Sequence, residues 1–233
     1  MTMKKWLGML LALMLMLMLG AGALAQDEGA VVQSSCSIVE VGEYHLVYCF
    51  AQVHNNAAQT ICLDEGNLHL MNGEETLASQ EVSGLWPMYI KPGEDGYLFD
   101  VVYLERGEAA PSITGIQYDV GYMTLEPPME GQKLEAQAHI EVSDESGRMY
   151  VVCEIANPTA EDAFNPTVGL GLYTEGGQML YADGVRLKDI GIPAGGRLKV
   201  RFDVETEVAE QWRGYGVTPT AAAANAVFSS VED

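Results

Sequence analysis

The sequence predicts an all-β protein made of two tandem immunoglobulin-like β-sandwich domains that follow an N-terminal signal peptide. Three observations lead to this prediction. Apolar and polar residues alternate along many short segments, turn residues separate those segments, and residues 38–102 resemble residues 140–204. Many short strands at regular spacing within about 95 residues favour a sandwich over a barrel or an α/β fold.

The first 25 residues have the three parts of a secretory signal peptide. Lys4 and Lys5 precede an apolar run over 6–19, and Ala23-Leu24-Ala25 stands before the polar Gln26. We expect cleavage after Ala25, with an uncleaved membrane anchor as the alternative. The remaining chain is expected outside the cytoplasm, secreted or associated with the cell envelope. No second apolar run of spanning length follows, so no membrane insertion is expected after cleavage.

An internal repeat is the main basis for predicting two domains. Without a gap, 38–102 aligns with 140–204, and chance would give roughly four identities at this composition. The alignment has eleven: Ile38/Ile140, Glu43/Glu145, Tyr48/Tyr150, Asn55/Asn157, Ala58/Ala160, Leu68/Leu170, Leu70/Leu172, Leu85/Leu187, Ile90/Ile192, Gly93/Gly195 and Val102/Val204. We therefore predict a duplicated domain.

The second copy, predicted over 134–233, shows the alternation most clearly. Two segments have apolar residues at every second position, and these are expected to face the core: Met149, Val151, Cys153 and Ile155, then Leu198, Val200, Phe202 and Val204. Another strand is expected over 168–173, followed by a turn at Gly176-Gly177. No amphipathic helix is expected after the signal peptide, and the Ala-rich tail from residue 221 could add a last strand.

The first copy, predicted over 33–124, repeats this scheme. Its core-facing residues are expected to be Tyr97, Phe99, Val101 and Tyr103, with a closing strand that carries Ile116, Tyr118, Val120 and Tyr122. Between the copies, residues 125–133 include Pro127-Pro128, which cannot continue a strand. We place the domain boundary in this linker.

The second copy resembles the FxLyD family of small bacterial extracytoplasmic domains, through the segment Leu170-Gly171-Leu172-Tyr173-Thr174. Leu stands there for the family's Phe, and Thr for its Asp. The first copy keeps only Leu68-His69-Leu70-Met71-Asn72. The resemblance implies an immunoglobulin-like sandwich at the cell envelope that serves as a binding or spacer module, and it implies no catalytic residues.

The net charge of the chain limits the classes of binding partner that are expected. It has 33 acidic against 12 basic residues, and its formal net charge is −21. Nucleic acids and anionic lipid surfaces reward clustered Lys and Arg, so neither is expected as a partner. An unknown protein or envelope ligand is expected instead.

The motifs of common enzymes are absent from the sequence. The four histidines, His45, His54, His69 and His139, do not form the H-x-x-x-H spacing of zinc hydrolases, and there is no P-loop or G-x-S-x-G elbow. No cofactor, metal site or catalytic residue is expected. The alternative is a secreted hydrolase whose site is assembled from loops.

Two cysteines are candidates for a disulfide in an oxidising compartment. Cys36 and Cys49 fall on the first two expected strands of the first copy, on either side of a turn near residue 42. A cross-strand bond between them is one interpretation, and four reduced, buried thiols are the other.

The first copy also has an unusually apolar outer face. The residues expected to point away from its core include Leu46, Tyr48, Phe50, Leu98 and Val102, whereas their counterparts in the second copy are polar. We expect this face to pack on the other domain, on a second copy of the chain through self-association, or on a foreign ligand. A register slip that places some of these side chains in the core is the alternative. Trp86 and Tyr89 are further interface candidates, in a recognition loop or folded over the sandwich.

Overall fold

The first half of the protein is built from two facing antiparallel sheets. In the computed structural model, which describes residues 29–105, 112–127 and 131–229, one sheet has the order β1-β2-β6-β5 and the other β4-β3-β7. The strands are β1 (Gly29–Val41), β2 (Tyr44–Asn55), β3 (Thr60–Asn72), β4 (Glu75–Glu81), β5 (Leu85–Trp86), β6 (Asp95–Glu105) and β7 (Gly115–Leu125). The expected signal peptide, residues 1–25, lies outside the described residues.

The second half repeats the same strand order. The strands β8-β9-β14 correspond to β1-β2-β6, and β12-β11-β15 to β4-β3-β7. The bounds are β8 (Gln132–Val142), β9 (Met149–Ala156), β11 (Thr167–Tyr173), β12 (Met179–Arg186), β14 (Arg197–Asp203) and β15 (Ala221–Phe228), with β10 (Ala163–Phe164) and β13 (Gly191–Ile192) as a small ribbon. The beginning of β8 pairs with β15 and the rest with β9, so β8 joins both sheets. The fold is therefore all-β and sandwich-like, as the alternation predicts.

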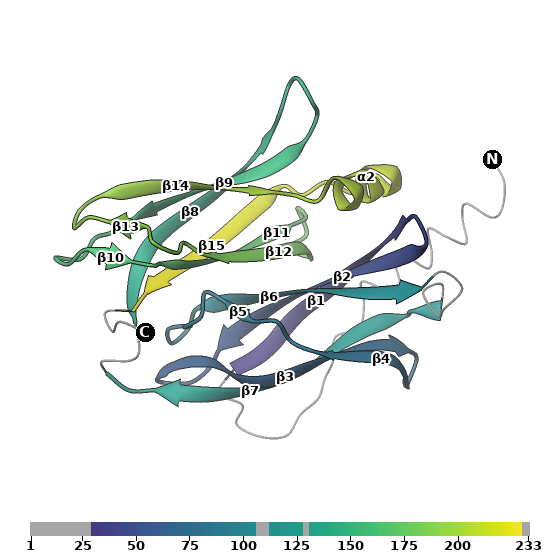
Figure 1. Ribbon diagram of the computed structural model, residues 1–233, viewed down its shortest axis with the longest axis horizontal. Helices are drawn as coiled ribbons and strands as arrows, with labels where there is room; N and C mark the ends of the chain where they lie inside the picture. The colour runs from purple at the N-terminus through teal and green to yellow at the C-terminus, as the bar shows by residue number, and fades with distance from the viewer. Residues whose placement is uncertain (1–28, 106–111, 128–130, 230–233) are drawn as a thin grey trace.

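The two halves are stacked as layers (Figure 1). The sheet that contains β2 and β6 lies in the middle of the molecule, between β3 and β7 on one side and β11 and β12 on the other. One buried cluster, which contains Leu68, Leu70 and Leu98, fills the first half. The other fills the second half and extends across the junction to Tyr48, Phe50 and Tyr97 of the first. The halves are thus joined by continuous apolar packing.

Two buried asparagines make the same hydrogen bonds in the two halves. The Asn55 side chain donates to the carbonyl oxygens of Gln59 and Ile90, both at 2.8 Å. The Asn157 side chain donates to the carbonyl oxygens of Glu161 and Ile192, at 2.7 and 2.9 Å. Every partner is displaced by the 102 residues of the sequence repeat. Each amide ties the end of one strand to the turn before another and leaves no buried polar atom of its own unpaired.

A helix interrupts the correspondence, and the expectation that the chain has none is wrong. Helix α2 (Thr206–Tyr215) buries Val208, Ala209 and Trp212 on one side and ends at Gly216, whose φ of 72° is the left-handed conformation that glycine adopts readily. The helix begins two residues after the repeat ends. Beyond it, Ala224 pairs with Leu170 as Tyr118 pairs with Leu68, an offset of 106 residues. The second half therefore has four additional residues here.

Candidate functional site

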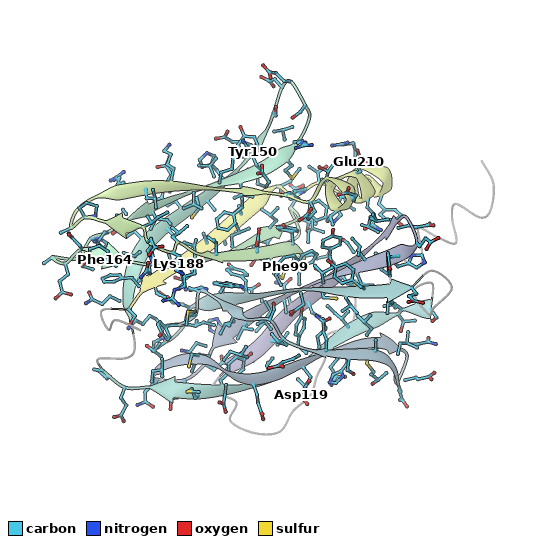
Figure 2. All side chains as sticks on the ribbon, viewed as in Figure 1. Phe99, Asp119, Tyr150, Phe164, Lys188 and Glu210 are labelled. Atoms are coloured by element: carbon cyan, nitrogen blue, oxygen red, sulfur yellow. The ribbon has the colours of Figure 1, made fainter. Side chains whose placement is uncertain are left out.

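The junction between the halves is lined by aromatic side chains. The Phe50 ring centroid lies 4.9 Å from that of Tyr181 and 5.7 Å from that of Phe99, and Tyr181 meets Trp212 edge-on at 6.1 Å. Figure 2 shows Phe99 between the halves, whereas Asp119 and Tyr150 lie on the two outer faces. Aromatic contacts of this kind add about 1 kcal/mol each beyond simple burial. The junction is therefore a well-packed internal surface.

Three glycines of the second half make room for side chains of the first. An added Cβ at Gly184 would lie 2.0 Å from Trp86 Cγ, and one at Gly169 would lie 2.1 Å from the Trp86 carbonyl oxygen. At Gly171, which belongs to the Leu170–Tyr173 motif of the sequence, it would lie 2.6 Å from Tyr97 Cε1. Even an alanine methyl would clash at these positions. These glycines were not predicted as contact residues, although glycine at every second position of a strand signals close approach of another segment.

Hydrogen bonds fix the register of the two halves. The Tyr173 hydroxyl donates to Gln52 Oε1 at 3.2 Å, and the Met179 amide donates to Gln33 Oε1 at 2.9 Å. At one end, the Asn225 side chain donates to Glu94 Oε2 at 3.0 Å. At the other, Gln211 of α2 donates to the Ile38 carbonyl oxygen at 2.8 Å. Polar contacts therefore border the apolar junction on several sides.

The structure divides the predicted interface residues into two groups. Leu46, Tyr48 and Phe50 of β2 contact the cluster that spans the junction. Leu98 and Val102 of β6 instead belong to the core of the first half, where they are 0% and 7% exposed. Their assignment to the outer face is therefore corrected.

The structure turns the opposite side of β6 toward the core of the first half. Asp100 lies on that side with Leu98 and is only 3% exposed. Since carboxyl groups are rarely buried, Asp100 gives the core side of β6 the polar residue that is expected of an outer side. The residues of β6 that reach the junction are Tyr97, Phe99 and Val101, which were predicted to face the core of the first half. Tyr103 was predicted to face that core as well, but it is 69% exposed.

A pocket of about 520 Å³ opens beside the junction, next to Trp86 and Tyr89. Its apolar lining comes from Leu63, Leu85, Trp86, Met88, Tyr89 and Leu125, and Cys62, Ser83, Gly84 and Ser229 complete the wall. No Lys, Arg or His lines it. Its volume lies in the range of small-molecule sites, and the mostly apolar wall with a few hydroxyl groups is typical of them. Trp86 and Tyr89 thus both line a concave surface, and Trp86 also packs on the second half.

The histidines do not assemble a metal or catalytic centre in the described part of the chain. His54 Nδ1 lies 2.8 Å from Asp95 Oδ1, and His69 Nδ1 lies 2.7 Å from Ser79 Oγ. The two histidines are on opposite sheets of the first half, His54 on β2 and His69 on β3. Within residues 29–105, 112–127 and 131–229, no three His, Cys, Asp or Glu side chains are placed to hold a metal ion. In the same residues, no helix is long and apolar enough to cross a bilayer.

The four cysteines are free thiols in the structure, so the disulfide interpretation of Cys36 and Cys49 does not describe this state. The β1–β2 register nevertheless places the two residues directly opposite each other. Burial raises the pKa of Cys36 to about 11, and burial also raises the pKa of Cys49 well above its ordinary value. Both groups are therefore protonated thiols at neutral pH.

Comparisons with known proteins leave the family of the chain open. No protein-family profile and no curated protein matches it. Among solved structures, the crystal structure of red sea bream transglutaminase matches with 13% identity and a TM-score of 0.22. The match covers 76% of this chain and 27% of that one. A likeness of this size carries no argument about activity.

Proposed function

We propose that the protein is a non-catalytic, extracytoplasmic binding module of the cell envelope, in which two copies of one immunoglobulin-like domain are locked into a rigid pair. The matching bonds of Asn55 and Asn157, and the common strand order of the halves, support the duplication. The signal-like sequence of residues 1–25 supports export. The outer face of the first half is covered by the second, so self-association through that face is not part of the proposal.

The observation that carries the proposal is the pocket beside the junction. It is a concave surface of ligand size, and two of its side chains come from the segment between β4 and β6, Trp86 from β5 and Tyr89 from the loop that follows. The wall offers large apolar surfaces and two serine hydroxyl groups, and it has no His, Lys, Asp or Glu side chain. Such a wall suits a small, largely apolar ligand that lacks negative charge, because the protein itself is strongly acidic.

Titration with N-phenyl-1-naphthylamine, a neutral probe that fluoresces in apolar sites, tests this proposal. We expect saturable binding to the full chain and a loss of about tenfold in affinity for Met88→Glu, which places a charge in the wall. Phe164→Glu is the matched control, because Phe164 is 61% exposed on β10 and does not line the pocket. Equal binding by wild type and Met88→Glu would show that the pocket is not a ligand site.

The secreted-hydrolase alternative has its own test. A panel of ester, glycoside and peptide substrates should show no turnover by the full chain. Turnover that is abolished by changing one carboxylate or histidine would replace the binding-module proposal with an enzyme.

A further inference from the structure

A row of three polar side chains crosses the core of the first half. Cys36 of β1 lies opposite Cys49 of β2, and Cys49 lies opposite Asp100 of β6. All three point toward β3 and β7. Cys49 is 0% exposed and Asp100 is 3% exposed, whereas Cys36, on the edge strand β1, is partly exposed. Two thiols and a carboxyl group therefore lie side by side under an accessible edge.

The second half shows that the fold does not need this polar row. Its corresponding register is Ile140 opposite Val151 and Val151 opposite Phe202, so all three places are apolar. A buried carboxyl group that replaces a phenyl ring lowers stability unless its oxygens are fully paired. The first half thus has polar side chains at three places where the second half packs apolar ones.

The carboxyl group of Asp100 is only half satisfied. Its Oδ1 accepts a hydrogen bond from the Ser83 amide at 2.8 Å. Its Oδ2 is buried and has no partner at normal hydrogen-bond geometry, and neither does the Tyr118 hydroxyl on β7. Burial raises the pKa of Asp100, while the Ser83 hydrogen bonds and the nearby Tyr118 hydroxyl lower it by a smaller amount. Oδ2 therefore lies beside Tyr118 without a well-formed hydrogen bond, and burial raises its proton affinity.

We propose that Cys36 and Cys49 are a reversible dithiol–disulfide pair and that Asp100 accepts the Cys49 proton when the bond closes. Residues directly opposite each other in antiparallel strands have Cα atoms about 4.5–5.5 Å apart, within the range that a disulfide spans. The bond can therefore close without moving either strand. This inference is independent of the pocket and of the proposed function.

The oxidant is a small-molecule or protein disulfide from outside. The small fraction of Cys36 that has lost its proton to water attacks one sulfur of that disulfide and forms a mixed disulfide, and the first external thiolate leaves and takes a proton from water. Cys49 then passes its proton to Asp100, and its thiolate attacks the Cys36 sulfur. The second external thiolate leaves and takes a proton from water, and Asp100 releases its proton to water. Overall, two protein thiols lose two electrons and the external disulfide becomes two thiols.

Incubation of the folded full chain with oxidised glutathione tests the pair itself. After alkylation of the remaining thiols, peptide mapping should recover Cys36 linked to Cys49, with reversal by reduced glutathione. The variant Cys62→Ser is the control, because Cys62 lies on β3 outside the row and its loss should leave the product unchanged. Four alkylated thiols, or glutathione held on Cys36 without closure, would overturn the proposal.

The proposed role of Asp100 is tested by measuring the rate at which the disulfide closes. From the mixed disulfide on Cys36, closure should be roughly a hundredfold slower in Asp100→Asn at pH 7, as expected when a general base is removed. The wild-type rate should fall as Asp100 becomes protonated at low pH, and that step should be missing from the variant. Equal rates and equal pH profiles would remove Asp100 from the mechanism.

A second variant serves if Asp100→Asn does not fold. The titratable groups that influence the row are Tyr118, Cys36 and Cys49 themselves. Because Tyr118 lowers the pKa of Asp100, Tyr118→Phe should move the low-pH fall in closure rate to a higher pH. A merely structural role for Tyr118 would change stability but leave the midpoint in place, and that result would also count against the proposal.

Discussion

The outer faces of two corresponding sheets have opposite surroundings in this protein. Tyr48 of β2 and Tyr150 of β9 are identical residues at equivalent places, yet Tyr48 is 7% exposed at the junction. Tyr150 lies on an outer face, where its hydroxyl donates to Glu141 at 2.7 Å and Arg201 lies 4.0 Å from its ring centroid. The neighbours of the two tyrosines differ in the same way, since Phe99 takes the place of Arg201. Whether the tyrosine lies in the junction or on an exposed surface therefore depends on the residues beside it, apolar in the first half and charged in the second.

The opposite faces complete the comparison. Where β11 has Gly169 and Gly171 to accept Trp86 and Tyr97, β3 has Asn67 and His69, whose side chains reach the surface or its edge. One sheet of each half is thus specialised for the junction, and its counterpart in the other half is polar. In the described residues, neither the glycine groove nor the aromatic face has a counterpart on the two outer faces.

The largest expected effect comes from the face that the junction covers. Phe50→Ala should lower the free energy of unfolding by about 4 kcal/mol, because it removes a fully buried ring that contacts Tyr181. Val152→Ala, at the equivalent place on the outer face, should cost less than about 1 kcal/mol. Urea unfolding followed by tryptophan fluorescence measures both, since Trp86 and Trp212 lie at the junction. Equal losses of stability in the two variants would show that the face at the junction is no more important for folding than the outer face.

The sequence predicts the fold class well, because strand alternation is a local property. It also contained the correct orientation of β6. In the repeat, Lys199 and Arg201 point outward, and their counterparts 102 residues earlier are Tyr97 and Phe99. The prediction took Tyr97 and Phe99 as core residues instead, so it inverted the strand, and the buried Asp100 interrupts the apolar side that would have shown the correct orientation.

Other features could not be found from local patterns. The pocket combines Leu63, Leu125 and Ser229, which are far apart in the chain and meet only through tertiary packing. Helix α2 has only three buried residues, at positions 208, 209 and 212, too few for a clear helical period. Both features form through tertiary contacts and not through a local sequence preference.

The glycine groove gives the next largest effect. Gly169→Ala should destabilise the protein by about 3 kcal/mol or open the junction, because the new methyl would overlap the Trp86 carbonyl oxygen. Gly115→Ala is the matched control, since a Cβ at Gly115 of β7 meets no atom within 4 Å. Small-angle scattering should show a larger radius of gyration only for Gly169→Ala. An unchanged radius together with unchanged stability would mean that the groove does not hold the halves together.

The two buried asparagines should respond alike, because their bonds correspond. Asn55→Ala and Asn157→Ala should each cost about 2 kcal/mol, since each removes donors to two carbonyl groups and an acceptor for one amide. Chemical denaturation of the two variants measures the costs side by side. If one variant clearly lost stability and the other did not, the two sets of hydrogen bonds would not contribute equally to the free energy of unfolding.

The smallest effect concerns an acidic side chain of the second half at a place where the first half has a neutral one. Opposite Leu68, β4 has the neutral Gln80, whereas β12 has Asp183 opposite Leu170. Burial raises the pKa of Asp183 to about 6, and the nearby Glu205 raises it as well, although the Gly184 amide and Tyr181 partly oppose this shift. Because the folded pKa lies above the ordinary value of 3.8, the folded protein binds the proton more tightly than the unfolded chain.

Asp183 should therefore favour the folded state at low pH and lose that contribution as pH rises through about 6. Asp183→Asn, which is neutral at every pH, should be more stable than wild type by about 1 kcal/mol at pH 7, a value reduced for partial solvent screening. Near pH 4 the two proteins should differ little. Taking the difference between them at each pH cancels the titration of Asp100, which both share. Thermal unfolding from pH 4 to pH 7 measures this difference, and a gap that stays constant with pH would show that Asp183 is not the group responsible.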